Sequence, residues 1–307
     1  MSQNQPILPG GQPVIQTRSL DLCQAFIKLL ADPERVYPTI GLVYGPPGIG
    51  KTTTIDYFLS QLYPQSHTKR PAVVRVHIKS RASAKALAPD IIKACGDKPQ
   101  STNDFERLDE AINSLERTHT RLLVADDADD ASLEALRDLR YIYDELNHKY
   151  YHGELPYPFR ILLIGNEAVD KLISRHEQFN SRVGLRHKFE ALKDEEVLQK
   201  FLPQIVFPRW QYDPDNQTDR EMGEWIWKVT NPCLRKVFDL LQTADQFTRN
   251  QNAPVITLDL IKQAQRQVRN LNRPKKSEPT PPAELSDTPL GPHEREAVAR
   301  QNYKQRR

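Results

Sequence analysis

The sequence has few cysteines and no long apolar run, and each absence excludes a class of protein. Its three cysteines, Cys23, Cys95 and Cys233, stand alone without a CxxC pair, so neither a disulfide framework nor a zinc site is indicated. The longest apolar runs, such as residues 161–164, are far shorter than the ~20 residues of a membrane span. The first residues, MSQNQPILPGGQPVIQ, lack the basic start and apolar stretch of a secretory signal. We therefore expect a cytoplasmic protein without a membrane partner.

Most of the chain also has no net charge. The 307 residues include 43 basic and 40 acidic side chains, a net charge of +3. Residues 273–307 alone hold that surplus, so residues 1–272 are formally neutral. Nucleic-acid binding by the folded part would need a local basic surface. The proportions of 38% hydrophobic and 27% charged residues are those of an ordinary soluble protein, long enough for one sizeable core and a smaller second one.

Five short apolar runs alternate with helical stretches along the first two thirds of the chain. They are residues 39–45, 72–78, 121–126, 159–165 and, less clearly, 186–192. Such alternation favours an α/β fold, in which helices cover both faces of a mostly parallel five-stranded sheet.

The rest of the chain departs from this pattern. Residues 1–17 are rich in Gln, Pro and Gly and predict a flexible arm before an α/β domain at 18–192. Helical periods alone run through 193–272, which indicates a small helical lid domain. Residues 273–307 contain six prolines and almost no apolar residues, too few to offset the entropy of ordering. We expect a disordered basic tail there, suited to tethering a partner.

One glycine-rich motif carries the chemistry. Residues 45–52, GPPGIGKT, match G-x-x-x-x-G-K-[ST] and lie between an apolar run and a helical stretch, as a phosphate-binding loop requires. The glycines let backbone N–H groups face the phosphates of ATP, and the start of the helix adds partial positive charge. We expect Lys51 to reach the β- and γ-phosphates and Thr52 to give Mg²⁺ a hydroxyl ligand. The expected nucleotide-binding residues of this stretch are Gly45, Pro46, Pro47, Gly48, Ile49, Gly50, Lys51, Thr52 and Thr53.

The run LLVADD, residues 122–127, completes such a site. The carboxylate of Asp126 ends a buried strand, where it can hold a magnesium-bound water. Asp127 stands where a general base would contact the attacking water, a position in which Glu is expected. Its side chain is one methylene, about 1.5 Å, shorter than Glu. A misplacement of that order can cost roughly a hundredfold in rate, so we expect slow hydrolysis of ATP.

Several polar residues at these strand ends also have a structural interpretation. Asp127, Asp129 and Asp130 can favour the start of a helix from Ser132. We adopt that interpretation for Asp129 and Asp130, and the catalytic one for Asp127. The run LLIGN ends at Asn166, whose amide can point at the γ-phosphate or the lytic water. The alternative is a turn-forming Asn that caps the next helix.

Together, GPPGIGKT, LLVADD, LLIGN and the helical region after them resemble an AAA+ ATPase. In order and spacing, and most closely in LLIGNEAVDKLISRHEQFNSRVGLRHKFEAL, the chain is similar to the TnsC/TniB transposition regulators, relatives of MuB. The resemblance covers roughly residues 18–270. It implies a P-loop AAA+ three-layer sandwich followed by a small α-helical lid, with residues 45–52 as Walker A and Asp126 as Walker B. The family pattern has Glu where this chain has Asp127, which puts the hydrolysis rate in doubt and leaves nucleotide binding unaffected.

The resemblance also implies roles for single residues. Asn166 becomes sensor 1. Arg182, in NSRVG, becomes the arginine finger that acts on ATP bound by the neighbouring subunit, with Arg186 in reserve. Either arginine can instead be an ion-paired surface side chain. The segment TNPCLRKV resembles sensor 2, in which Arg235 or Lys236 would contact phosphate; we favour Arg235.

Regulators of this family form ATP-dependent rings or helical filaments on duplex DNA, with about six or seven subunits per turn. The resemblance therefore implies a bacterial ATPase that uses ATP and Mg²⁺ and has no transposase chemistry of its own. Its partners would be further copies of itself, double-stranded DNA, a transposase and a TniQ-type adaptor, including those of CRISPR-associated transposons. The alternative is a STAND-like or initiator-like nucleotide switch that acts on a protein partner.

Candidate DNA contacts follow the second apolar run, in HIKSRASAKAL. Lys79, Arg81 and Lys85 lie near the start of an expected helix, among serine residues. Basic side chains and hydroxyls in such a place suit contacts to phosphate, which bind without reading sequence. A solvated helix start is the alternative for each residue.

Overall fold

The structure is a computed structural model that describes residues 15, 17–32, 35–63, 72–79, 87–231 and 233–271. The chain divides into two compact units, Met1–Gln265 and Arg266–Arg307, and the sheet lies in the first. The tail expected at 273–307 and most of the arm expected at 1–17 lie outside the described residues. The described part contains no helix with the length and apolar character needed to cross a membrane.

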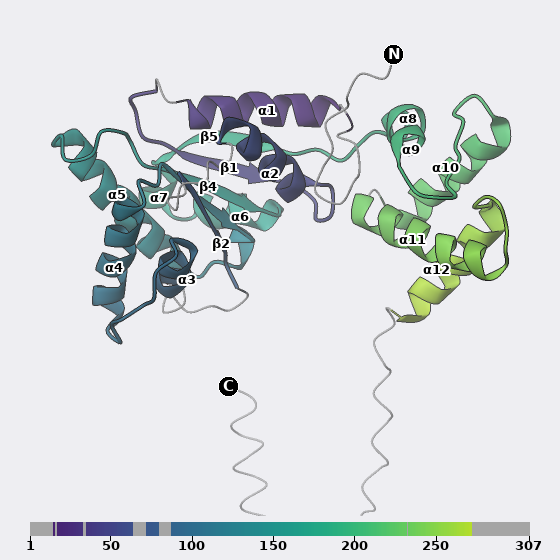
Figure 1. Ribbon diagram of the computed structural model, residues 1–307. Helices are drawn as coiled ribbons and strands as arrows, with labels where there is room; N and C mark the ends of the chain where they lie inside the picture. Colours follow the sequence, from purple (N-terminus) through teal and green to yellow (C-terminus); the bar gives the residue numbers. More distant parts are fainter. Residues whose placement is uncertain are drawn as a thin grey trace, which may run out of the picture. The chain divides into compact units, whose positions relative to one another are not determined.

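A five-stranded parallel sheet forms the middle layer of the α/β part of the first unit (Figure 1). Its strands are β1 (Ile40–Tyr44), β2 (Val73–His77), β3 (Leu122–Asp126), β4 (Arg160–Gly165) and β5 (Val183–Lys188). They lie in the order β2-β3-β4-β1-β5, and every neighbouring pair is parallel. Strands β3 and β4 are buried throughout, which explains their continuous Leu, Ile and Val runs. The expected parallel five-stranded sheet is confirmed.

The last strand does not lie where the sequence predicted it. Residues 186–192 were expected, whereas β5 spans Val183–Lys188. It pairs with β1 from Ile40↔Val183 to Tyr44↔Lys188 and therefore ends where β1 ends. Burial alternates along this edge strand, so its apolar signal is weaker than that of the central strands.

Helices cover both faces of the sheet, as Figure 1 shows. On one face lie α1 (Arg18–Ala31) and α2 (Lys51–Leu62), whose buried side chains form a core with Val43, Val124 and Ile164. The other face carries the helices α3 (Leu87–Ala94), α4 (Asp104–Arg117), α5 (Leu133–Tyr151), α6 (Glu167–Ser174) and α7 (Glu177–Asn180). Neighbouring residues of one strand thus enter different cores, and the fold is a three-layer sandwich.

The helices that follow β5 have a core of their own. They are α8 (Asp194–Glu196), the π-helical turn η3 (Val197–Phe201), α9 (Leu202–Gln204), α10 (Gln217–Thr230), α11 (Leu234–Asn250) and α12 (Leu258–Leu271). Ile226, Val237 and Leu241 are fully buried in this core. Trp227 donates a hydrogen bond from Nε1 to Asp194 at 2.9 Å. The helical region predicted after the sheet is therefore present.

Candidate nucleotide-binding site

The glycine-rich loop joins β1 to α2 at the carboxyl end of the sheet. Gly48 and Gly50 have φ angles of 72° and 95°, in the left-handed region that glycine enters without strain. A Cβ on Gly48 would also lie 2.4 Å from Cys233 Sγ. Pro47 and Gly48 form the turn, and helix α2 begins directly after Gly50. The sequence therefore places a helix N-terminus, with its free N–H groups, at this end of the sheet.

Lys51 lies inside the curve of this loop. Its side chain is buried, and Nζ donates hydrogen bonds to the carbonyl oxygens of Gly45 at 2.9 Å and Pro46 at 2.8 Å. Burial lowers the pKa of Lys51, while the carboxylates of Asp129 and Asp126 oppose that shift. The loop therefore holds a cation where a phosphate-binding loop needs one.

Thr52 and Asp126 come together at the same edge. Thr52 Oγ1 donates a hydrogen bond to Asp126 Oδ2 at 3.1 Å, and only 4% of Asp126 is exposed. Mg²⁺ prefers oxygen ligands, and it combines one or two protein ligands with waters and substrate phosphates. This hydroxyl and carboxylate fit that pattern. Within the described residues, no group of three or more His, Cys, Asp or Glu side chains could hold a metal by itself.

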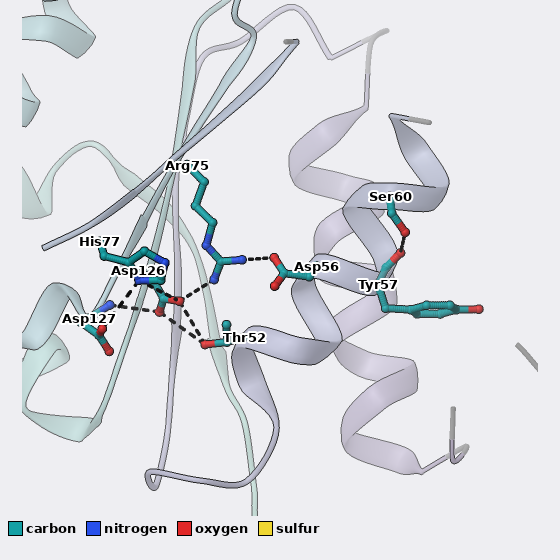
Figure 2. A network of polar contacts seen from close by, with 8 residues as sticks. All are labelled: Thr52, Asp56, Tyr57, Ser60, Arg75, His77, Asp126 and Asp127. Atoms are coloured by element: carbon teal, nitrogen blue, oxygen red, sulfur yellow. Dashed lines mark hydrogen bonds and ion pairs between the residues drawn. The ribbon is translucent and has the colours of Figure 1, made fainter. Parts of the chain in front are cut away.

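Two residues of β2, Arg75 and His77, also reach Asp126 (Figure 2). The Arg75 guanidinium donates hydrogen bonds to Asp126 and to Asp56 of α2. His77 Nδ1 lies 3.8 Å from Asp127 Oδ2 and 3.9 Å from Asp126 Oδ2. Neither residue belongs to a motif that the sequence alone reveals. His77 pairs with Asp126 across the neighbouring strands, and that adjacency follows from the strand order alone.

Asp127 follows β3 in an unusual backbone conformation. Its φ and ψ angles are 55° and 38°, in the left-handed region that Asp tolerates better than most residues. The side chain is 66% exposed. Partial burial and the neighbouring Asp126 carboxylate raise its pKa, and His77 opposes the shift. The carboxylate is accessible beside the Thr52–Asp126 pair, as a base acting on water would need to be.

Asn166 follows β4 and caps α6, as the structural alternative predicted, with Oδ1 accepting a hydrogen bond from Ala168 N at 2.7 Å. Its backbone N–H donates to Asp129 Oδ1 at 2.9 Å, and its side-chain amide donates to the other carboxylate oxygen. Asp129 therefore makes a contact that the helix-start interpretation did not predict. Ser132 caps α5 by accepting from Ala135 N at 3.1 Å, whereas Asp129 contacts Asn166 because β3 and β4 are neighbours.

The two arginine-finger candidates are ion-paired within the chain, as the alternative for them predicted. Arg182 Nε and Nη2 donate to the Asp144 carboxylate at 2.6 and 2.8 Å. Arg186 Nε lies 3.1 Å from Asp170 Oδ1. Arg182 precedes β5 and pairs with the amino end of β1, its carbonyl accepting from Ile40 N at 3.0 Å. The loop at residues 45–50 follows the carboxyl end of β1, about 16 Å away along five residues. Arg182 therefore lies at the opposite end of β1 from its own chain's loop.

Of the three candidate DNA contacts, only Lys79 is described; Arg81 and Lys85 lie outside the described residues. The Lys79 side chain is 67% exposed, and Nζ pairs with Asp90 of α3 at 2.8 Å. An exposed ion pair of this kind is weak, so Lys79 remains available to an external phosphate.

A cavity of 330 Å³ lies beside the glycine-rich loop. Its polar lining includes Thr53 and Arg235, both expected to bind nucleotide. Arg235 also donates its backbone N–H to Gly48 O at 3.2 Å. The apolar lining includes Leu20, Ile49, Tyr57, Phe189, Leu234 and Phe238. The volume and apolar lining suit the base and ribose of a nucleotide. Apart from Ile49, these apolar residues were not predicted from the sequence, since they come from α1, α2, α11 and the end of β5.

Comparisons with known proteins agree with this geometry. Residues 34–173 match the family described as AAA domain. A potential ATP-binding protein of Staphylococcus aureus is 22% identical over 272 residues, covering 80% of this chain and 92% of that protein. The structure is similar to Cdc6p of Pyrobaculum aerophilum, with a TM-score of 0.65 and 16% identity over 85% of this chain and 69% of that one. It is also similar to the ORC1 protein of Aeropyrum pernix, solved in complex with DNA, with a TM-score of 0.60 and 15% identity over 81% of this chain and 64% of that one. At these identities the solved structures establish a common fold.

Proposed function

We propose that this chain, whose residues 34–173 form an AAA-family P-loop ATPase domain, is a DNA-binding ATPase that regulates transposition. The proposal that the chain binds nucleotide rests on three side chains that lie together at one edge of the sheet. Lys51 lies inside the glycine-rich loop, and Thr52 is hydrogen-bonded to Asp126 at 3.1 Å. These are the groups that a P-loop ATPase needs around the β- and γ-phosphates.

The chain's own residues then divide the work of hydrolysis. The loop amides and Lys51 bind the phosphates, and the cavity beside them takes the nucleoside. Thr52 and Asp126 would hold Mg²⁺, which would supply positive charge to the phosphate oxygens. Asp127 accepts the proton of the attacking water, and the Asn166 amide orients that water or the γ-phosphate. Because Asp127 is short for this task, hydrolysis is slow and the ATP state is long-lived.

The position of Arg182 supports an assembly of several copies of the chain. Arg182 lies at the end of the strands opposite the loop, so we assign its action to the ATP of a neighbouring subunit. ATP then serves as the switch for a ring or filament on duplex DNA, bound without sequence preference through Lys79 and its neighbours. Such an assembly marks a target and recruits a transposase and a TniQ-type adaptor. Support for transposition is the similarity of residues 162–192 to TnsC/TniB regulators.

The test is co-sedimentation of the protein with a random-sequence DNA duplex under ATP, a non-hydrolysable ATP analogue or ADP, at two salt concentrations. We expect salt-sensitive sedimentation that requires the triphosphate. Lys51→Ala should lose it, whereas Lys228→Ala, a change at an exposed lysine of α10, should keep it. Failure to bind DNA with any nucleotide would favour the second candidate, an initiator-like switch acting on a protein. The fold shared with Cdc6p is the observation behind that candidate.

A further inference from the structure

Arg75 closes a ring of polar contacts around the candidate metal site. Its guanidinium donates one hydrogen bond to Asp126 and another to Asp56. Asp126 accepts from Thr52 Oγ1 at 3.1 Å. Thr52 and Asp56 lie four residues apart, on one face of α2, so the helix completes the ring, as Figure 2 shows.

The ring joins parts of the fold that the sheet keeps apart. Strand β2 is an edge strand, and β3 and β4 separate it from β1, after which α2 begins. Arg75 spans this separation because its planar fork can bind two carboxylates at once. One of them, on Asp126, is only 5% exposed, whereas that of Asp56 is 46% exposed. The guanidinium thus fixes a buried carboxylate on one side and the P-loop helix on the other.

Charge gives this ring a consequence for nucleotide binding. A buried carboxylate is costly unless it is paired, and Asp126 lies beside the loop expected to receive a polyphosphate. Without a cation near Asp126, its charge would repel the phosphates over a few ångströms in a poorly solvated place. Lys51 is one cation of the site, and its amine is hydrogen-bonded to loop carbonyls. Arg75 is the cation in direct contact with Asp126.

We propose that Arg75 is the positioning residue of the metal site. It holds the Asp126 carboxylate against Thr52 and balances its charge, so that the chain binds adenine nucleotide with only modest dependence on Mg²⁺. This inference rests on the proposed ATP site. If Arg75 only stabilised the fold, its substitution would lower stability and would weaken nucleotide binding equally with and without the metal.

The experiment measures the dissociation constant of a fluorescent ADP in excess EDTA and in Mg²⁺. The quantity compared between variants is the constant in EDTA divided by the constant in Mg²⁺. Arg75→Gln should raise the ratio about tenfold over wild type, because removal of one adjacent charge is worth about that factor. Arg75→Lys should stay near the wild-type ratio, since it keeps the charge. Arg160→Gln is the control: it removes a second arginine, which is buried at the start of β4 and bonded to Arg35 O, and it should leave the ratio unchanged.

An Arg75→Gln ratio equal to that of wild type would overturn the inference and leave the ATP site standing. If wild type binds no nucleotide, the proposed function fails and this inference fails with it. If Arg75→Gln does not fold, Arg75→Met replaces it. That variant keeps the apolar stem but removes the same positive charge from Asp126, so it should raise the ratio by a similar factor, and an unchanged ratio there would equally overturn the inference.

Discussion

Asn166 is joined to Asp129 by two hydrogen bonds, one from its backbone N–H at 2.9 Å and one from its side-chain amide. The contact links the loop after β3 to the loop after β4. With Oδ1 held by Ala168 N at 2.7 Å, both ends of the amide are fixed. The orientation of the candidate sensor therefore depends on a carboxylate outside the P-loop and Walker B motifs.

Asp129→Asn should reduce turnover more than binding. The change removes the charge that holds the Asn166 amide, and a displacement of about 1 Å at a catalytic group lowers rates by up to roughly a hundredfold. We expect kcat for ATP to fall about tenfold, with KM within about threefold of wild type. Asp130→Asn, at the exposed neighbour, is the control and should change neither value. If Asp129→Asn raised KM for ATP by the same factor as it lowered kcat, Asp129 would act on the glycine-rich loop rather than on Asn166.

Asp127 is tested by a pair of substitutions. Asparagine enters the left-handed backbone region readily, so Asp127→Asn preserves the local fold while it removes the base. Its kcat should fall about a hundredfold or more, with the unfolding midpoint unchanged. Asp127→Glu extends the carboxylate by about 1.5 Å and should raise kcat above wild type. Steady-state phosphate release measures both, and near wild-type rates in Asp127→Asn would make Asp127 a surface charge only.

Gly48→Ala should cost more than its backbone angle alone predicts. Gly48 and Gly153 have similar φ angles of 72° and 77°, but a Cβ on Gly48 would meet Cys233 Sγ at 2.4 Å, whereas the space around Gly153 is open. Both alanine variants should lose about 1 kcal/mol of unfolding free energy from backbone strain. Only Gly48→Ala should also weaken nucleotide binding, by about tenfold or more, and Cys233→Ala in the same chain should restore part of that affinity.

Equilibrium unfolding and nucleotide titration separate the loss of stability from the loss of nucleotide affinity. Both are measured on wild type, Gly48→Ala, Gly153→Ala and the double variant with Cys233→Ala. Equal nucleotide affinity in Gly48→Ala and Gly153→Ala would contradict the packing of Cys233 against the loop.

Asp138 should make stability depend on pH. Burial, followed by the charges of Glu134 and Asp104, raises its pKa from 3.8 to about 6. The pKa of Asp138 in the folded state lies above its ordinary value, so the protonated carboxyl adds to the free energy of unfolding. This contribution is complete below about pH 4 and is lost as the pH rises through 6. Asp138→Asn stays neutral, so it should gain about 1 kcal/mol over wild type between pH 4 and 7, allowing for solvent screening. Urea unfolding at several pH values measures this, and a difference independent of pH would contradict it.

The sequence sufficed for the parts of the fold and site that lie in continuous stretches. GPPGIGKT and the buried strand before Asp126 place Lys51, Thr52 and Asp126 because a parallel sheet brings the carboxyl ends of its strands to one edge. The left-handed glycines and the helix start of α2 follow from the same eight residues. The predicted position of β5 was three residues too late at its start, because alternate burial along an edge strand leaves little apolar signal.

The contacts that the sequence analysis missed depend on strand order. Arg75 lies in VVRVH, where alternation makes it look like a solvent-facing residue, and its bond to Asp126 requires β2 beside β3. The contact of Asp129 with Asn166 likewise requires β3 beside β4. The apolar cavity draws residues from four separated segments. No local pattern encodes these long-range neighbours, so single-sequence reasoning had no signal for them.

We propose that the triphosphate switches this chain onto DNA. The most direct test is the fluorescence anisotropy of a labelled random-sequence duplex, titrated with wild-type protein in a non-hydrolysable ATP analogue and, at the same salt concentration, in ADP. Binding at least about tenfold tighter with the analogue, a difference of about 1.4 kcal/mol, is the predicted result. Equal affinity in the two nucleotides would contradict it.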